Sequence, residues 1–365
     1  MKITIVCPAT PQWTGKGYQR RALEIERSLS RDHQVVVQAY GGRGQLRTAL
    51  KALVELARDP WLPLEVAWVR GSGHILADGV ASDVTVYVTA RAAPRRLPDS
   101  SVVDFVDANQ LSAERRAAHL RGPARWVWCM EARRMTRWET GLAEQAAVTV
   151  AVAATDAAVL CKGTRVVPLA LPARPEGFVG GRDNRIVFTG NLHFGPNEEA
   201  VRWICTSLAP ALDAVGVSRK SLMVAGRGPR RALRSLAANA GIEMRPNVPN
   251  MWEVLERAAV SIAPVFRATG MQSKVLDAVA AGIPVVMSPV AAEGVPLRAG
   301  HSASVVELSP PAFAAAIAKL VNDPRRCQEV AEAAQHDCAA LDAARVSDAW
   351  RSLVGAVAAG ASVDA

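Results

Sequence analysis

The stretch at residues 260–295 reads VSIAPVFRATGMQSKVLDAVAAGIPVVMSPVAAEGV, and its pattern decides the fold class. It opens with VSIAP, a short apolar run with β-branched residues, which predicts a buried strand. A loop follows, and then a helix is predicted over residues 271–281, with Gly270 at its start and Gly282 where a left-handed C-cap is typical. The run PVVMS predicts a second buried strand. Strand, helix and strand in this order are typical of an α/β domain with a parallel sheet.

The predicted helix carries polar groups along one face. At about 100° per residue, Gly270, Lys274 and Asp277 fall on one stripe. The amides of the first turn and the helix dipole attract an anion such as a phosphate, and Lys274 adds a positive charge one turn further in. The Asp277 carboxylate can accept hydrogen bonds from both hydroxyls of a ribose. The stripe therefore predicts a nucleotide site. The alternative is an ordinary helix in which Lys274 and Asp277 form a solvated pair.

The length and the linker composition indicate two domains. The chain has 365 residues, and 50% of them are hydrophobic, which is enough for two packed cores. Residues 171–183, LPARPEGFVGGRD, are rich in proline and glycine and predict a linker. We therefore expect a first domain at residues 1–172, a second at residues 173–345, and a final helix at residues 346–365 that returns to the first domain.

The cysteines and the apolar runs exclude several classes of protein. The six cysteines have no CxxC spacing and no histidines at zinc-finger spacing, so we expect reduced thiols rather than a zinc site or a disulfide framework. The start, MKITIVCP, is too short and strand-like for a signal peptide. Polar residues interrupt the longest apolar run, near residues 146–161, so no membrane span is expected. We expect a cytoplasmic protein, with peripheral contact at the inner face of the membrane as a further option.

The positive charge is concentrated in the first half of the chain. The formal net charge is +9. Residues 1–182 hold 25 Lys and Arg against 17 Asp and Glu, whereas residues 183–365 are nearly neutral. This asymmetry favours different binding partners for the two halves.

Arginine and tryptophan alternate in one predicted helical stretch, residues 113–145. Seven arginines lie there together with Trp126, Trp128 and Trp138. This combination suits a lipid surface, where phosphates meet apolar material, or a nucleic-acid surface. The alternative is a solvated basic helix whose tryptophans pack into the core.

Both halves alternate strands and helices, which predicts two doubly wound sheets. No GxGxxG sequence follows the first strand, and this disfavours a dinucleotide-dependent dehydrogenase. In the first half, strands are predicted at residues 3–7, 33–40, 65–70, 84–89, 102–106, 148–152 and 164–168, and helices at residues 18–30 and 45–57. In the second half, further strands are predicted at residues 185–189, 221–225, 242–245 and 305–308, and helices from Pro196, at residues 250–258, at residues 311–322 and over the tail at residues 324–361.

Several motifs resemble a known enzyme family. They are VFTGNLHFGPNEEAVRW at residues 187–203, VAGRGP at 224–229, the opening stretch at 261–288, AAEG at 291–294, and, more loosely, DFVDANQ at 104–110 and EARRMTRWE at 131–139. Together they are similar to retaining, nucleotide-sugar-dependent glycosyltransferases of family 4, particularly the bacterial members of polysaccharide biosynthesis. The resemblance implies the GT-B architecture, an α/β fold of two doubly wound Rossmann-like domains facing a cleft.

The resemblance also implies a nucleotide-sugar donor bound mostly by the second domain. The usual family signature is two glutamates eight positions apart. The first, near the donor sugar, falls on Thr269, and the second, which holds the ribose diol, falls on Asp277. The family usually offers two cations to the diphosphate after the first strand of this domain, but this chain has GNLH there. The expected donor-binding residues are Gly190, Asn191, His193, Arg227, Thr269, Gly270, Met271 and Asp277.

The implied reaction transfers a glycosyl group from a nucleoside diphosphate sugar to the hydroxyl of a glycan, a lipid-linked glycan or a small aglycone. Negative charge builds up on the departing diphosphate, so cations aimed at it stabilise the transition state. Arg267 and Lys274 are the expected catalytic cations, with Arg227 beside them. No DxD pair stands where a metal would be needed, so we expect no metal and no cofactor.

The first domain is expected to bind the acceptor. Asp107, at the end of a predicted strand, is the candidate for acceptor binding or for the catalytic base, and a role as helix N-cap or loop residue is the alternative. The loop at residues 8–17, PATPQWTGKG, is expected to contact the acceptor through Gly15, Lys16 and Gly17.

Two other functions compete with glycosyl transfer. One is a nucleotide-sugar 2-epimerase on the same scaffold, which would favour a cleft richer in histidine and glutamate. The other is a non-catalytic protein that binds a sugar nucleotide or a nucleic acid, because Thr269 replaces a family glutamate and the first half is basic. No nucleic-acid-binding module accompanies that charge, so no nucleic-acid partner is expected.

Overall fold

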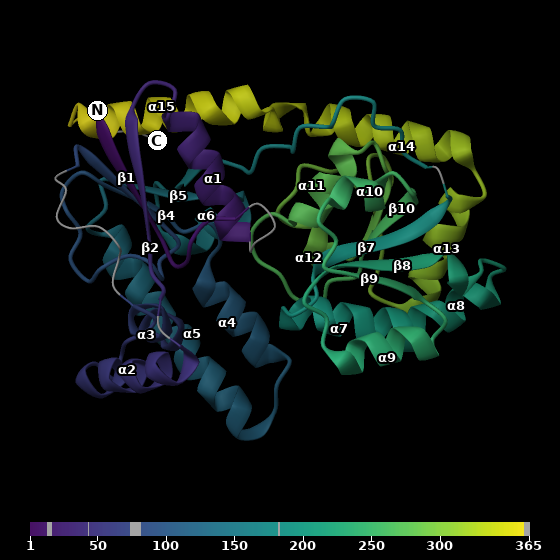
Figure 1. Cartoon of the computed structure of the whole chain (residues 1–365), viewed down its shortest axis with the longest axis horizontal. Coiled ribbons are helices and arrows are strands. Elements are labelled where there is room, and N and C mark those ends of the chain that lie inside the picture. Colours follow the sequence, from purple (N-terminus) through teal and green to yellow (C-terminus); the bar gives the residue numbers. More distant parts are fainter. Residues whose placement is uncertain (13–16, 43, 74–81, 182, 361–365) are drawn as a thin grey trace. The chain divides into compact units, whose positions relative to one another are not determined.

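The computed structural model describes residues 1–12, 17–42, 44–73, 82–181 and 183–360, and it divides into two compact units (Figure 1). Unit 1 comprises Met1–Ala170, Thr269–Met271 and Ala344–Ala365. Unit 2 comprises Leu171–Ala268 and Gln272–Ala343. Unit 1 is thus built from both ends of the chain, together with three residues of the stretch at 260–295.

Unit 1 contains a six-stranded parallel sheet in the order β2-β1-β3-β4-β5-β6. Its strands are runs of β-branched residues, as expected for strands that are covered on both faces. The sheet order reverses between β1 and β3, which makes this point the topological switch of the sheet. The strands are β1 (Lys2–Cys7), β2 (Gln34–Ala39), β3 (Val84–Val88), β4 (Ser101–Asp104), β5 (Val148–Ala151) and β6 (Arg165–Val166).

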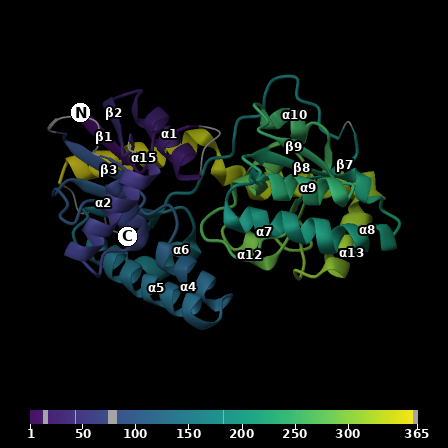
Figure 2. The ribbon, with the colours of Figure 1, turned by 60° about the horizontal axis from the view of Figure 1, so that its bottom comes forward.

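Helices cover both faces of this sheet (Figures 1 and 2). One face packs against α3 and α5, whose buried side chains share a core with those of β1, β4 and β5. The helices of unit 1 are α1 (Gly17–Leu29), α2 (Gln45–Arg58), α3 (Leu64–Gly71), α4 (Asn109–Ala118), α5 (Gly122–Ala143), α6 (Ala154–Leu160) and the C-terminal α15 (Ala343–Ala358). No described helix is both long and apolar enough to span a bilayer.

The strand predicted at residues 65–70 is wrong, because this segment forms helix α3. Its β-branched content suggested a strand, but Val66 and Val69 are buried while Trp68 is 47% exposed, which is the spacing of a helix and not of a strand. The helix ends at Gly71, where a Cβ atom would lie 2.6 Å from the Thr48 carbonyl oxygen. The tight packing of α2 on α3 therefore depends on a glycine.

The single helical stretch predicted at residues 113–145 is also wrong, since two helices, α4 and α5, occupy it. Gly122 (φ 60°) turns the chain between them. The sequence allowed the tryptophans either a surface or a core position, and the structure has examples of both. Trp138 is buried and its Nε1 donates to the Ala90 carbonyl oxygen at 2.9 Å, whereas Trp126 is 67% exposed. The stretch is thus part core and part surface.

Unit 2 contains a second six-stranded parallel sheet, in the order β12-β11-β10-β7-β8-β9. Counted within the unit, this is the strand order of a Rossmann fold, with the switch point between β7 and β10. The strands are β7 (Arg185–Asn191), β8 (Leu222–Arg227), β9 (Glu243–Pro246), β10 (Ala258–Ala263), β11 (Val285–Met287) and β12 (Ser304–Val305). The two parallel α/β sheets give the architecture that the sequence predicted.

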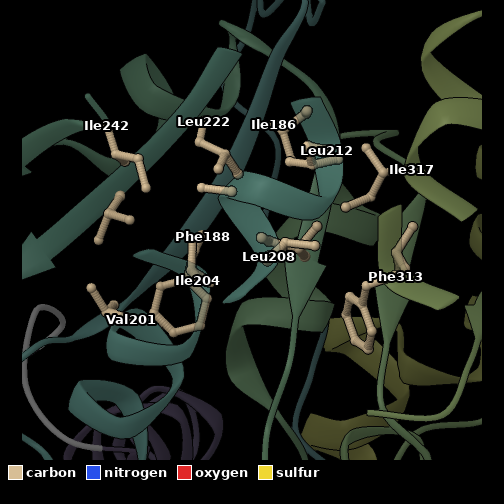
Figure 3. Close-up of a cluster of buried hydrophobic side chains, with 14 of the residues drawn as sticks. Ile186, Phe188, Val201, Ile204, Leu208, Leu212, Leu222, Ile242, Phe313 and Ile317 are labelled. Carbon is tan, nitrogen blue, oxygen red and sulfur yellow. The ribbon is translucent and has the colours of Figure 1, made fainter. Parts of the chain in front are cut away.

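The core of unit 2 lies between this sheet and the helices below it in Figure 1, and Figure 3 shows its side chains. Ile186 and Phe188 from β7 pack with Val201, Ile204 and Leu208 from the helical segment that follows β7, and all are fully buried. The helical segments of the unit are α7 (Gly195–Trp203), a π-helical turn (Ile204–Leu208), α8 (Ala209–Ala214), α9 (Arg231–Asn239), α10 (Met251–Leu255), α11 (Ser273–Ala280), α12 (Pro289–Ala292), α13 (Pro310–Val321) and α14 (Pro324–Asp337), with short 3-10 turns at Arg219–Ser221 and Ala339–Leu341.

The opening stretch differs from its prediction at one point. Helix α11 begins at Ser273, so Gly270 lies in the preceding loop with φ 65° and is not part of the helical stripe. The predicted helix start at Gly270 was therefore too early, since the N-cap is the extended residue Gln272. The predicted C-cap is confirmed, since Gly282 has φ 69° directly after the Ala281 cap.

A fully buried arginine joins four separate segments of unit 1. Arg21 of α1 donates through Nε to an Asp104 carboxylate oxygen at 2.8 Å. Its two terminal nitrogens donate to the carbonyl oxygens of Pro168 (2.8 Å) and Val167 (2.6 Å). The guanidinium also lies over the Trp350 ring of α15, 4.8 Å from the centroid. Every part of this cation therefore has a partner, which is the condition under which a buried charge is tolerated.

We predict that Arg21→Met destabilises the protein by about 3–5 kcal/mol, because the Asp104 carboxylate would stay buried without its counter-charge. Urea unfolding monitored by circular dichroism measures this loss. Arg351→Met is the matched control, since that arginine is partly exposed and its carboxylate partners are mostly solvated. The control should lose less than about 1 kcal/mol. Equal losses in both variants would contradict the structural importance of the buried pair.

Candidate functional site

In unit 2 the candidate site lies where the strand order reverses. Ligands of doubly wound sheets bind at the carboxyl ends of the strands beside this point. Here those ends are Asn191 on β7, Arg227 on β8 and Ala263 on β10. The predicted donor-binding residues follow them closely in the chain, with His193 after β7, Arg267 after β10, and Lys274 and Asp277 on α11.

The ends of β7 and β8 approach each other unusually closely. A Cβ atom on Gly226, whose φ is 153°, would lie 1.7 Å from the Gly190 carbonyl oxygen. The chain after Gly226 is held by Asn247, whose side-chain Oδ1 accepts the Gly228 amide at 2.8 Å. Glycines at these positions allow the two strand ends and the Asn197 side chain to pack closely together.

A buried lysine lies at the centre of this group. Lys274 is 7% exposed, and its Nζ donates to Asn197 Oδ1 at 2.6 Å. The Asn197 amide nitrogen in turn donates to the Asn191 carbonyl oxygen at 3.0 Å. The Lys274 ammonium also lies over the Phe188 ring, 4.5 Å from its centroid. Asn197 thus connects the end of β7 to the cation of α11.

The surroundings of Lys274 suit an anion. An ammonium group has three hydrogens to donate, and Asn197 accepts one of them. Burial lowers the pKa of the Lys274 amine to about 7, and no carboxylate of the described residues offsets this effect. A buried cation with only a neutral partner is stabilised when an anion binds beside it. The start of α11 adds to this, because Gln272 gives its amides no side-chain cap.

The other polar residues predicted to bind the donor in unit 2 are less buried than Lys274. Arg267 pairs with Glu199 of α7 at 3.1 Å, and its Nε is a buried donor without a hydrogen-bond partner among the described residues. The side chains of Arg227 and His193 are exposed, and the His193 amide donates to Asn191 Oδ1 at 3.1 Å. Asp277 is partly buried on α11, one turn beyond Lys274.

In unit 1 a second polar group lies at the ends of β3 and β4, beside the switch point of the first sheet. Two β-branched residues there adopt left-handed backbone conformations, Thr89 with φ 71° and Val106 with φ 64°. Asp104 stabilises both, because its carbonyl oxygen accepts the Thr89 amide at 2.7 Å and its carboxylate accepts the Val106 amide at 3.0 Å. Such strain in β-branched residues is concentrated at functional sites.

Asp107, the predicted acceptor residue, follows the strained turn. Its Oδ2 accepts a hydrogen bond from the Thr269 hydroxyl at 2.8 Å, and Thr269 belongs to unit 1. Burial raises the pKa of the Asp107 carboxyl, against the opposing effects of Arg91 and of the Thr269 hydroxyl. Asp107 therefore meets the residue that stands in place of the first family glutamate.

Arg91 is a charged neighbour that the sequence analysis missed. It pairs with Glu65 of α3 at 2.8 Å and lies 5.3 Å from the centroid of the Tyr18 ring. Burial acts to lower the pKa of Arg91, but the carboxylates of Glu65 and Asp107 outweigh it, and the pKa is raised. Its position after β3, beside the switch point, was the available signal.

Gly270 and Met271 also belong to unit 1. The Gly270 amide donates to Asp156 at 2.9 Å, and the buried Met271 sulfur accepts the Leu169 amide at 3.3 Å. Asp156 also accepts the amide of Ala108, just before α4. These partners are fixed parts of unit 1 and were not predicted.

The start of α4 is already capped by a carboxylate. Glu139 accepts the amides of Asn109 at 2.9 Å and Gln110 at 3.1 Å, and burial raises the pKa of Glu139 to about 7. The motifs DFVDANQ and EARRMTRWE meet through these bonds. The polar residues of the first motif thus serve partly to build the turn before α4. Of the predicted acceptor residues, Gly17 begins α1, while Gly15 and Lys16 lie outside the described residues.

Sequence and structure comparisons agree with this architecture. Residues 183–323 match the family model described as glycosyl transferases group 1. This range contains β7 to β12 and the whole Lys274 group. The matched part of the chain is thus similar to group 1 glycosyl transferases, and the two parallel α/β sheets have the GT-B fold. No match was found among curated protein sequences.

The solved structures that resemble the chain share the GT-B fold at low sequence identity. Sucrose-phosphate synthase (tll1590) from Thermosynechococcus elongatus has a TM-score of 0.71 at 10% identity, with 99% of each chain covered. Anabaena Alr3699/HepE in complex with UDP-glucose has a TM-score of 0.66 at 13% identity, covering 98% of this chain and 100% of the other. WaaG, a glycosyltransferase involved in lipopolysaccharide biosynthesis, has a TM-score of 0.62 at 14% identity, covering 96% and 99%.

We predict that Lys274 gives the stability of the protein a distinct pH dependence. The unfolded chain keeps the Lys274 proton up to its ordinary value near 10.5, whereas burial lowers the pKa in the folded protein to about 7. Between these values the unfolded state binds more protons, so the free energy of unfolding rises with pH. In Lys274→Met this contribution disappears. Urea unfolding of both proteins across this range measures the difference, and identical slopes would contradict a buried, weakly partnered amine.

Proposed function

We propose that the protein transfers a glycosyl group from a nucleoside diphosphate sugar to an acceptor hydroxyl. The observation that carries the proposal is the Lys274 group, in which a buried cation with one neutral acceptor lies beside an uncapped helix start at the switch point of the second sheet. A diphosphate supplies the anionic oxygens that such a group lacks. The group 1 match over the same residues supports this assignment.

The donor would bind with its diphosphate near Lys274 and its ribose further along α11. Asp277 lies one turn beyond Lys274, at a distance that suits the next part of a nucleotide. Its carboxylate would accept the two ribose hydroxyls. Arg227 and Arg267 would add positive charge from the ends of β8 and β10. The absence of a side chain at Gly190 leaves room for Asn197, which accepts from Lys274 and would help to hold it toward the donor.

Catalysis would consist mainly of stabilising the leaving diphosphate. The bond between the anomeric carbon and the diphosphate oxygen breaks, and a new bond forms to the acceptor oxygen. Lys274, Arg267 and the amides of α11 would neutralise the charge that develops on the departing group. Because these groups are fixed before the donor binds, little reorganisation is needed during the reaction. We propose that the reaction needs no metal and retains the anomeric configuration, as in family 4.

Asp107 is the proposed contact for the acceptor hydroxyl. Burial raises the pKa of its carboxyl, which makes its carboxylate a stronger proton acceptor. Arg91 keeps a positive charge nearby that stabilises the ionised form. The Thr269 hydroxyl donates to this carboxylate. A sugar or lipid-linked hydroxyl would make the same kind of hydrogen bond, and a polysaccharide precursor is the acceptor class that we favour.

We predict that Lys274→Met and Asp277→Ala each weaken nucleoside diphosphate binding by about 10- to 100-fold, because a hydrogen bond to a charged group contributes about 1.5–3 kcal/mol. Isothermal calorimetry with UDP, GDP and dTDP measures the affinities and selects the base. Lys319→Met, on the exposed surface of α13, is the matched control and should bind like the wild type. Unchanged affinity in both site variants would refute the assignment.

We also predict that glycosyl transfer continues in the presence of EDTA, since the protein's own cations are proposed to stabilise the leaving diphosphate. A thermal-shift screen with UDP-, GDP- and dTDP-sugars first identifies the donor. Release of the nucleoside diphosphate, measured with and without the chelator, then tests whether the reaction needs a metal. Activity lost in EDTA and restored by Mn²⁺ or Mg²⁺ would show that a metal supplies the charge instead.

A further inference from the structure

Helix α2 of unit 1 is buried along only one narrow face. Of its side chains, Thr48 and Ala52 are the buried ones, and they pack toward α3, where the absence of a side chain on Gly71 allows close approach. The rest of the helix is partly or fully exposed. Figure 1 shows α2 as the outermost helix on its side of unit 1.

The exposed face of α2 is apolar. Leu46 is 75% exposed, Leu50 56%, Leu53 62% and Val54 42%. At about 100° per residue these four positions form one continuous stripe along the helix, opposite the buried face. Isolated exposed leucines are common, but a contiguous stripe on a helix indicates an interaction surface. The stripe has no partner in this chain among the described residues.

Positive charge borders this stripe. Arg47, Lys51 and Arg58 fall next to it on the helix, and a surface hollow of about 230 Å³ is lined by Arg47, Leu50, Lys51 and Val54. The only carboxylate of the helix, Glu55, lies 3.7 Å from Arg58 and 3.9 Å from Arg70. The rim of the stripe is therefore cationic, and its one anion is neutralised within unit 1.

The start of α5 also combines exposed apolar side chains with basic ones. Trp126 is 67% exposed and Val127 43% exposed, beside the exposed Arg121 and Arg125. Residues 115–130 contain no Asp or Glu. Figure 1 draws α2, α3 and α5 in the lower part of unit 1, and buried side chains of all three helices belong to one hydrophobic cluster. Helix α3 contacts α5 directly, since the Leu64 amide donates to a Glu131 carboxylate oxygen at 2.7 Å.

We propose that α2 and the start of α5 dock on an anionic lipid bilayer, with α2 lying in the plane of the headgroups. An interfacial helix of this kind inserts its apolar stripe between lipids while its basic rim binds their phosphates. A second copy of the chain fits less well. In a two-fold interface the same patches face each other, so the cationic rims would repel.

The test is flotation of the full chain with vesicles of phosphatidylglycerol mixed with phosphatidylcholine, and with vesicles of phosphatidylcholine alone. The wild type should bind the anionic vesicles and release on addition of salt, because screening weakens its basic contacts. Leu50→Asp/Leu53→Asp should lower the bound fraction by about tenfold or more, since two charges would enter the apolar layer. Arg47→Gln/Lys51→Gln should weaken binding to the anionic vesicles.

The matched control is Val179→Asp/Val215→Asp, which adds the same charge at exposed apolar positions of unit 2. It should bind like the wild type, and thermal unfolding should show that all variants remain folded. Three outcomes would overturn the proposal. They are a wild type that ignores anionic vesicles, a leucine variant that binds as well as the wild type, and a wild-type dimer in light scattering that the leucine variant disperses.

Discussion

Unit 1 depends on one buried ionic interaction, between Arg21 and Asp104. A buried charge is tolerated only when its partners are complete, and those of Arg21 come from a strand, the segment before unit 2 and the C-terminal helix. The carboxylate of Asp104 also accepts a hydrogen bond from the Val106 amide in the strained turn. The turn that presents Asp107 is therefore coupled to the packing of the whole unit.

The second unit is organised by close backbone approach rather than by a buried ion pair. Glycines at the ends of β7 and β8 bring two strand ends together, and Asn197 connects that region to the cation on α11. Phe188 serves both the hydrophobic core and the site, since its ring packs among the side chains of Figure 3 and also lies under the Lys274 ammonium. The position of the cation thus follows from the packing of the core.

Local sequence was sufficient where local chemistry decides the structure. The strands of unit 2 are apolar runs bounded by glycine and proline, and Gly282 has the left-handed conformation that a C-cap requires. It was insufficient at α3, because EVAWVR has the residues of a strand and only its packing against α2 and the core makes it a helix. Helix and strand preferences of so short a segment are weaker than tertiary packing.

The site could be predicted in its residue types but not in its contacts. Lys274 and Asp277 follow from helical spacing, whereas Asn197 lies 77 positions before Lys274 and no pattern connects the two. Thr269 and Asp107 are 162 positions apart, and Arg91 belongs to a loop without any motif. Hydrogen bonds over such separations arise from the order of the strands in the sheet, which is known only once the chain is folded.

Unit 1 is assembled from segments at both ends of the chain, and this affects how it can fold during synthesis. Trp350 covers Arg21, but it is synthesised more than three hundred residues later, after all of unit 2. Domains generally fold as units while the chain leaves the ribosome. All residues of unit 2 are therefore synthesised before Trp350 of α15, so the core of unit 2 can form while Arg21 of unit 1 is not yet covered. The part of the protein that is translated first is the last to be finished.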